Sequence, residues 1–323
     1  MRVWRSLEDV PADLGRTVVT VGNFDGVHLG HQRVLRRARQ EADKLGAEAL
    51  VAVTFDPHPM AVLRPEHAPV VITSIERRAE LLGAAGVDAV LVVRFDRDLS
   101  SWSPERFVEQ ILVGTLHAAA VVVGENFRFG SRAAGDVALL ERLGRQLDET
   151  GDRGFRAVGV PLGGGPEIWS SSYVRRCLAE GDVEAAAAAL GRPVSVRGPV
   201  QRGDRRGREL GYPTANVAIG DEAAPGDGVY AGWLTVLEDG ARHPAAISVG
   251  TNPTFEGQRH RRVEAHVLDT DDLDLYDREV EVSFTSRLRG MERFDTVEEL
   301  LDAMARDVAR ARQALVAAEG AGS

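Results

Sequence analysis

The residues best suited to chemistry form one string, in which two histidines follow a glycine-bearing turn: Gly22-Asn23-Phe24-Asp25-Gly26-Val27-His28-Leu29-Gly30-His31. An apolar run, residues 17–21, precedes the string, and an Arg-rich helical pattern, residues 32–45, follows it. A strand, a turn and a helix start in this order aim backbone N–H groups and the positive end of the helix dipole at one point, which suits a phosphate. His28 and His31 add donors for a polyphosphate; a turn that only caps a helix is the alternative. The other residues assigned to ligand contact are Gly22, Phe24, Asp25 and Gly26.

Three more polar strings follow apolar runs farther along the chain, at 54–59, 124–130 and 170–175. Prolines fix the backbone of the first, aromatic residues flank the second, and serines that can cap a helix or bind phosphate begin the third. Each string alone also fits an ordinary turn or cap, but their common place after strands favours a site. Their candidate site residues are Asp56, His58, Asn126, Ser171, Ser172 and Arg175.

A second group of candidates lies in the last third of the chain, where glycines punctuate residues 203–211. Such a loop gives phosphates access to the backbone. Thr214 and Asn216 follow it, two residues apart and therefore on one face of an extended segment. Both offer neutral oxygens, which suit a Mg²⁺ ion that keeps waters and phosphate ligands. The loop residues assigned to ATP binding are Gly203, Gly207 and Gly211.

Glu264 and His266 share one face of a strictly alternating segment, residues 263–267. A lone strand glutamate is most often a solvated charge on the polar face. The alternative is a general base, which phosphoryl transfer to a neutral alcohol requires close to the hydroxyl.

The elements that must position these residues fall into two groups. From residue 17 to about 160, apolar strands alternate with helical patterns, which is typical of a doubly wound parallel sheet covered on both faces. Ligands bind such sheets at the carboxyl ends of their strands. The expected strands are 18–22, 49–54, 89–93, 119–124 and 155–160; the expected helices are 32–45, 75–85 with a capping box at Thr73 and Glu76, 104–112, 137–149, 172–180 and 183–190.

After residue 191 strands follow one another directly, which predicts an antiparallel β-barrel or sandwich of about six strands, and we adopt the barrel. A terminal helix, 296–318, has apolar residues at helical spacing and should pack against it. The domains are therefore expected at 1–190 and 191–323. The expected strands are 194–200, 228–237, 245–249, 262–268 and 280–285.

Composition narrows the function classes. A net charge of −10 argues against a nucleic-acid surface, and the longest apolar runs are strand-length, so no membrane partner is expected. The N-terminus lacks the apolar core of a signal peptide, which predicts a cytoplasmic protein. The single cysteine, Cys177, excludes an internal disulfide, and the single lysine, Lys44, does not lie in a P-loop. A homo-oligomeric state is left open.

The HxGH string resembles the signature of the nucleotidyltransferase superfamily. Its longer form, G-N-F-D-G-V-H-L-G-H, is similar to the adenylyltransferase half of the prokaryotic bifunctional riboflavin kinase/FAD synthetases. The strings FDPHP, GENFRFG and SSSYVR resemble that family too, although Ser172 replaces its usual threonine and Trp169 and Tyr173 are larger than usual. In the second half, PTAN and VEAHVLD resemble the family's riboflavin kinase motifs.

The resemblance implies two ATP- and Mg²⁺-dependent reactions, phosphorylation of riboflavin to FMN and adenylyl transfer to FMN to give FAD and pyrophosphate. It implies that His28 and His31 contact the triphosphate, Asn126 the FMN phosphate or flavin side, and Glu264 the riboflavin 5′-hydroxyl. It further implies contacts of Ser171, Ser172 and Arg175 with the β- and γ-phosphates, of Asn252 in a loop over the substrate, and of Arg287 beside the flavin ring. The alternatives are another small-molecule nucleotidyltransferase fused to an unrelated barrel, or a non-catalytic flavin-binding protein.

Overall fold

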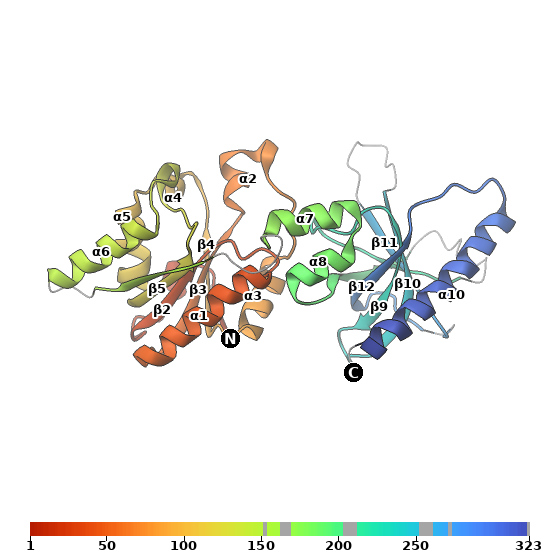
Figure 1. Ribbon diagram of the computed structural model, residues 1–323, viewed down its shortest axis with the longest axis horizontal. Coiled ribbons are helices and arrows are strands. Elements are labelled where there is room, and N and C mark those ends of the chain that lie inside the picture. Colours follow the sequence, from red (N-terminus) through yellow and green to blue (C-terminus); the bar gives the residue numbers. More distant parts are fainter. Residues whose placement is uncertain (151–153, 162–168, 203–211, 252–260, 271–272, 322–323) are drawn as a thin grey trace. The chain divides into compact units, whose positions relative to one another are not determined.

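The structure is a computed structural model that describes residues 1–323 except 151–153, 162–168, 203–211, 252–260, 271–272 and 322–323 (Figure 1). Contacts divide the chain into two compact units, Met1–Ser170 and Ser171–Ser323. Two helices, α7 (Ser171–Glu180) and α8 (Val183–Leu190), contact each other, and α8 also contacts barrel strands β7 (Val194–Gln201) and β12 (Glu279–Arg289). The contacts therefore place these helices with the second unit, whereas the functional boundary at residue 190 stays a prediction.

The first unit is built on a six-stranded sheet in which every pairing is parallel, in the order β1-β4-β3-β2-β5-β6. This confirms the predicted parallel sheet and adds β1, whose three residues are too few to show a period. The strands are β1 (Arg2–Trp4), β2 (Thr17–Val21), β3 (Ala49–Asp56), β4 (Ala89–Arg94), β5 (Ala118–Gly124) and β6 (Arg156–Val160).

Helices cover both faces of this sheet, as the continuous apolar strands require. One apolar cluster joins Val18 and Leu50 to α1 (Leu29–Leu45) and α3 (Ile75–Ala84). The other joins Val19 and Val51 to α5 (Pro104–Phe107) and the π-helical segment η3 (Val108–Thr115), and it includes α6 (Val137–Glu149). The doubly wound prediction is therefore confirmed. Shorter elements are η1 (Leu7–Asp9), α2 (Pro59–Leu63), η2 (Pro65–His67), α4 (Arg97–Ser101) and η4 (Ser131–Ala133).

The predicted capping box of α3 is wrong. Ser74, not Thr73, is the N-cap, and its hydroxyl accepts from the N–H of Arg77 at 3.3 Å. The Thr73 hydroxyl instead accepts from the N–H of Gly26 at 3.1 Å, and it donates to Asp25. A tertiary contact with the Gly22–His31 turn thus takes the hydroxyl that the local sequence pattern assigned to the helix.

The second unit is a closed barrel with strand order β10-β11-β8-β7-β12-β9, in which each strand pairs antiparallel with its neighbours. The remaining strands are β8 (Ala215–Val217), β9 (Gly228–Val236), β10 (Arg242–Thr251) and β11 (Arg261–Val267). The terminal helix α10 (Val297–Ala321) packs on the outside, where Ala311 and Leu315 meet Ala231 and Ala246. The predicted barrel and terminal helix are both confirmed. None of the described helices is both long and apolar enough to cross a membrane.

Candidate functional site

The turn between β2 and α1 has an unusual backbone. Phe24, Gly26 and Val27 all adopt positive φ angles, of 48°, 80° and 41°. This region favours glycine, and for the β-branched Val27 it is strained. Phe24 and Val27 are each 2% exposed and pack in the apolar cluster beneath α1, which holds the backbone in place. A strained backbone that is overdetermined by its packing is a common feature of ligand sites.

Glycine is required in this string because other groups occupy the space of a side chain. A Cβ on Gly22 would lie 3.3 Å from the Phe24 ring. A Cβ on Gly30 would lie 3.0 Å from the His28 ring and 3.0 Å from the carbonyl oxygen of Trp169. Gly30 therefore leaves room for His28, which gives the HxGH spacing a steric reason.

The two histidines form a stacked pair at the start of α1. His28 is the N-cap, and its Nδ1 accepts from the N–H of His31 at 3.4 Å. The ring centroids lie 3.6 Å apart, and Phe24 meets His31 edge-on. Because Nδ1 of His28 accepts, the neutral ring carries its proton on Nε2. Burial lowers the pKa of His31 well below its usual range, and the neighbouring His28 and Arg78 lower it further. His31 therefore offers a neutral imidazole at the positive end of a helix dipole.

Asp25 is buried behind the turn and is 1% exposed. Its carboxylate accepts from the N–H groups of Ile72 and Thr73, each at 3.0 Å, and from the Thr73 hydroxyl at 3.2 Å. These bonds tie the turn to the segment before α3. Asp25 thus positions the turn, and a direct contact of its carboxylate with a ligand stays a prediction.

Other predicted residues lie at the same edge of the sheet, because the carboxyl ends of β3, β2 and β5 are neighbours. Asp56 ends β3 and is exposed. His58 caps α2, and its Nε2 lies 3.1 Å from the Asn23 side-chain amide, which joins this string to the turn. Asn126 is exposed in the turn after β5, beside the stacked rings of Phe127 and Phe129. Ser171, Ser172 and Arg175 lie in α7, in the other unit.

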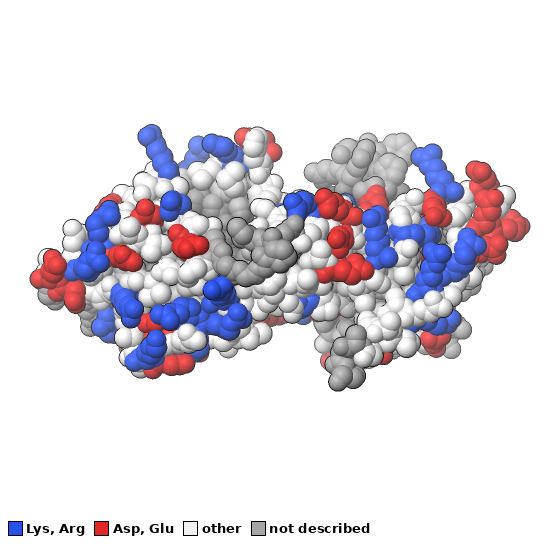
Figure 2. Space-filling view, in the orientation of Figure 1, with Lys and Arg blue, Asp and Glu red and all other residues white. Residues whose placement is uncertain are grey.

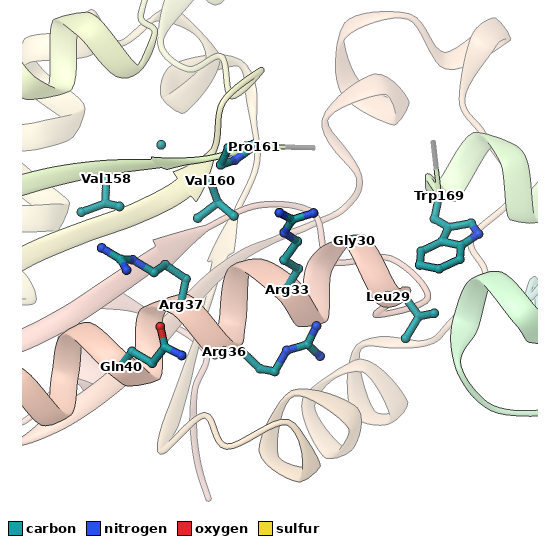
Figure 3. A pocket seen from close by; sticks show the side chains of 11 residues that line it. Leu29, Gly30, Arg33, Arg36, Arg37, Gln40, Val158, Val160, Pro161 and Trp169 are labelled. Atoms are coloured by element: carbon teal, nitrogen blue, oxygen red, sulfur yellow. The ribbon is translucent and has the colours of Figure 1, made fainter. Parts of the chain in front are cut away.

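A cavity of about 760 Å³ runs along α1 beside the Gly22–His31 turn, hereafter the histidine turn. Gly30, Arg33 and Arg36 line one wall, the end of β6 lines another, and Trp169 lies near Gly30 (Figure 3). None of the described residues that line it is acidic, and Lys and Arg side chains gather over α1 (Figure 2). Arg37 also faces the cavity, but it forms an ion pair with Glu41 at 2.7 Å. Sequence reasoning missed these arginines, although Arg33 and Arg36 are spaced by one helical turn.

In the barrel, strand register brings two predicted residues together. Glu264 of β11 lies directly opposite Asn216 of β8. Directly opposed residues of antiparallel strands share a face, with Cβ atoms about 5 Å apart. Gln201 of β7 is opposite Asn216, and Ser248 of β10 is opposite Glu264. These four half-buried or exposed residues form a polar row on the outside of the barrel, hereafter the barrel row.

The segment that carries Thr214 is anchored by His266. The Nδ1 of His266 lies 2.9 Å from the carbonyl oxygen of Pro213, so this nitrogen donates, and the ring meets Tyr212 edge-on. The Arg287 guanidinium donates at 2.9 Å to the carbonyl oxygens of Glu180 and Asp227. Gly203, Gly207, Gly211 and Asn252 lie outside the described residues. Among the residues that the structure describes, no cluster of three His, Cys, Asp or Glu side chains could hold a metal ion.

Comparisons with known proteins cover both units. The FAD synthetase family model matches residues 10–153, and the riboflavin kinase family model matches residues 190–315. The bifunctional riboflavin kinase/FMN adenylyltransferase of Escherichia coli (strain K12) is 36% identical over 299 residues, 92% of each chain. That of Pseudomonas fluorescens is 38% identical over 312 residues, 97% of each chain.

A solved structure described as a macrolide-efflux protein from Streptococcus pneumoniae superposes with a TM-score of 0.85 at 29% identity. The match covers 96% of this chain and 98% of that one, so the two-unit fold is shared along its length. The riboflavin kinase match excludes an unrelated barrel, and the full-length matches exclude a non-catalytic binding protein. The chain belongs to the bifunctional riboflavin kinase/FMN adenylyltransferase family and has both of these activities.

Proposed function

We propose that the histidine turn and the barrel row are the two reaction centres, the first for FMN adenylyl transfer and the second for riboflavin phosphorylation. The functional domains are then residues 1–190 and 191–323. The observation that carries the proposal is the direct opposition of Glu264 and Asn216, because it sets a carboxylate beside an amide oxygen on one barrel face. The residues that alternate with Glu264, Val263 and Ala265, are fully buried, so Glu264 faces away from the packed interior of the barrel.

For adenylyl transfer, the triphosphate of ATP lies across the start of α1, where His28 and His31 donate hydrogen bonds. The nucleoside extends into the cavity lined by Arg33 and Trp169. The FMN phosphate oxygen attacks the α-phosphorus, the bond to the pyrophosphate oxygen breaks, and pyrophosphate leaves. This nucleophile is already anionic at neutral pH, so alignment and charge stabilisation suffice. Asn126 receives the FMN phosphate, and Ser171, Ser172 and Arg175 hold the β- and γ-phosphates.

For the kinase reaction, Glu264 takes the proton of the riboflavin 5′-hydroxyl as its oxygen attacks the γ-phosphorus of ATP and ADP leaves. Thr214 and Asn216 would hold Mg²⁺, because their neutral oxygens suit an ion that keeps several waters and phosphate ligands. When bound, the ion neutralises charge on the transferring phosphate. His266 fixes the segment before Thr214 through its bond to Pro213. The flavin ring lies toward Arg287.

Reciprocal single-site variants test the assignment. The purified chain is incubated with ATP and Mg²⁺ and either riboflavin or FMN, and products are separated by chromatography. Glu264→Gln should stop FMN formation and leave FMN-to-FAD conversion intact, whereas His31→Ala should do the reverse. Glu279→Gln is the matched control, since it removes an exposed glutamate charge from β12, outside the barrel row. Loss of both activities in either variant would refute the division of labour.

A cytoplasmic location is also proposed, and cell fractionation tests it.

A further inference from the structure

Arg78, a buried cation of α3, has no role in the two reactions as proposed above. It is 3% exposed. Its guanidinium donates to the Thr54 hydroxyl at 3.3 Å, to the carbonyl oxygen of Thr73 at 3.1 Å and to the Asp25 carboxylate at 3.5 Å. Burying a charge is costly unless it is paired and hydrogen-bonded. The arginine therefore needs these partners, and the partners in turn are fixed by it.

Each of the three partners of Arg78 either contacts the histidine turn or belongs to it. The Thr54 hydroxyl donates to the carbonyl oxygen of Asn23 at 3.0 Å. The Thr73 hydroxyl accepts from the N–H of Gly26, and Asp25 is itself part of the turn. A single guanidinium thus fixes the turn at Asn23, Asp25 and Gly26, directly before His28. This is the stretch whose positive φ angles need support from surrounding structure.

We propose that Arg78 is a positioning residue for adenylyl transfer, which holds the strained turn and thereby sets the place of the His28–His31 pair. The proposal rests on the function assigned above to that pair. Its charge also acts on the site, because Arg78 contributes to lowering the pKa of His31. A direct contact of Arg78 with a substrate is not part of the proposal, since Arg78 is 3% exposed and its partners Asp25 and Thr54 are each 1% exposed.

Three variants and the barrel activity test the proposal in the full-length chain. Arg78→Gln should lower kcat for FMN-to-FAD conversion by about 10- to 100-fold, with a smaller change in KM for ATP, because misplaced reacting groups cost rate more than binding. Arg78→Lys keeps the charge and should recover part of this loss. Arg77→Gln is the matched control on the same helix, where Arg77 pairs with Glu80 at 2.9 Å. Riboflavin phosphorylation should be unchanged in all three.

Thr54→Val tests whether the Thr54 hydroxyl connects Arg78 to the turn, and it does so without removing a buried charge. It deletes the hydroxyl that links Arg78 to Asn23, so kcat should fall, and the double variant with Arg78→Gln should lose little more than Arg78→Gln alone. If Arg78→Gln abolishes the thermal transition of the first unit, Thr54→Val and Arg78→Lys carry the test.

Wild-type kcat in Arg78→Gln, or a fully additive double variant, would overturn the proposal. His31→Ala, measured in parallel, separates the failures. If His31→Ala loses adenylyl transfer while Arg78→Gln keeps it, only the role of Arg78 is wrong. If both keep it, the assignment of the histidine turn is wrong.

Discussion

The two proposed reaction centres, the histidine turn and the barrel row, are held in place by different kinds of structure. The histidine turn is part of the packing of its unit, since Phe24 and Val27 are buried in a strained backbone and Asp25 is enclosed by hydrogen bonds. The barrel row lies on an ordinary antiparallel ladder, and Glu264 and Asn216 alternate with the residues that fill the interior. Substitutions of the buried residues that shape the turn, Phe24, Asp25 and Val27, should therefore change stability and activity together. Substitutions in the barrel row should change activity alone.

The largest expected effect is the loss of kinase activity in a barrel-row variant that still folds normally. Glu264→Gln should lower riboflavin phosphorylation by at least about 100-fold, because it removes the proposed base while preserving shape. Its midpoint of thermal unfolding should match that of the wild type, measured by circular dichroism. A large drop in that midpoint would contradict the contrast between the two centres.

Asp25→Asn tests the opposite expectation for the turn. The amide cannot replace a carboxylate that accepts several bonds and faces the Arg78 guanidinium, so the first unit should lose about 3 kcal/mol of stability. Urea unfolding, followed by fluorescence, measures this loss, and riboflavin phosphorylation reports whether the barrel still works. An unchanged unfolding midpoint would mean that the buried network does not support the turn.

His31→Ala should lower FMN-to-FAD conversion more than tenfold without unfolding the first unit, because about one to several kcal/mol of phosphate stabilisation is lost. Initial rates of FAD formation at saturating FMN provide the measurement. Wild-type FAD production by this variant would remove His31 from the site.

The smallest expected effect is on how the unfolding free energy of the first unit depends on pH. Because the folded protein lowers the pKa of His31 below its ordinary value of 6.5, the unfolded chain binds this proton more tightly. The contribution of His31 therefore favours unfolding as the pH falls below that value toward the lower folded pKa. The difference in unfolding free energy of the first unit between about pH 7.5 and about pH 5 should be smaller in His31→Ala. An equal difference in both proteins would show that His31 titrates normally.

The sequence predicted those features that depend on local pattern. Apolar runs such as residues 49–54 alternate with helical patterns, and this predicted the parallel sheet. The strict alternation around Glu264 predicted which of its neighbours face the interior. Thr73 marks the limit of such reasoning, because its hydroxyl bonds to a turn 47 residues away instead of capping α3.

The remaining features depend on long-range register and packing. That Glu264 is opposite Asn216 follows from the pairing of β11 with β8, and no local period encodes a pairing between distant segments. Arg78 likewise looks like any helical arginine in the sequence, and only the fold encloses it beside Asp25 and Thr54. The cavity arginines, Arg33 and Arg36, lie on a basic helix face, and the cavity exists only because β6 and Trp169 form its other walls.

The strand pairings of the barrel differ in length, which affects how parts of its proposed site can move. The shortest strand, β8, pairs with β11 at three residues and with β7 at two. In contrast, β11 pairs with β10 along seven residues. Strands with few ladder bonds open at lower free energy than strands with many. The proposed base thus lies on a firmly paired strand, and Asn216, a proposed metal ligand, lies on a weakly paired one. Local opening of the barrel should therefore displace Asn216 before it displaces Glu264.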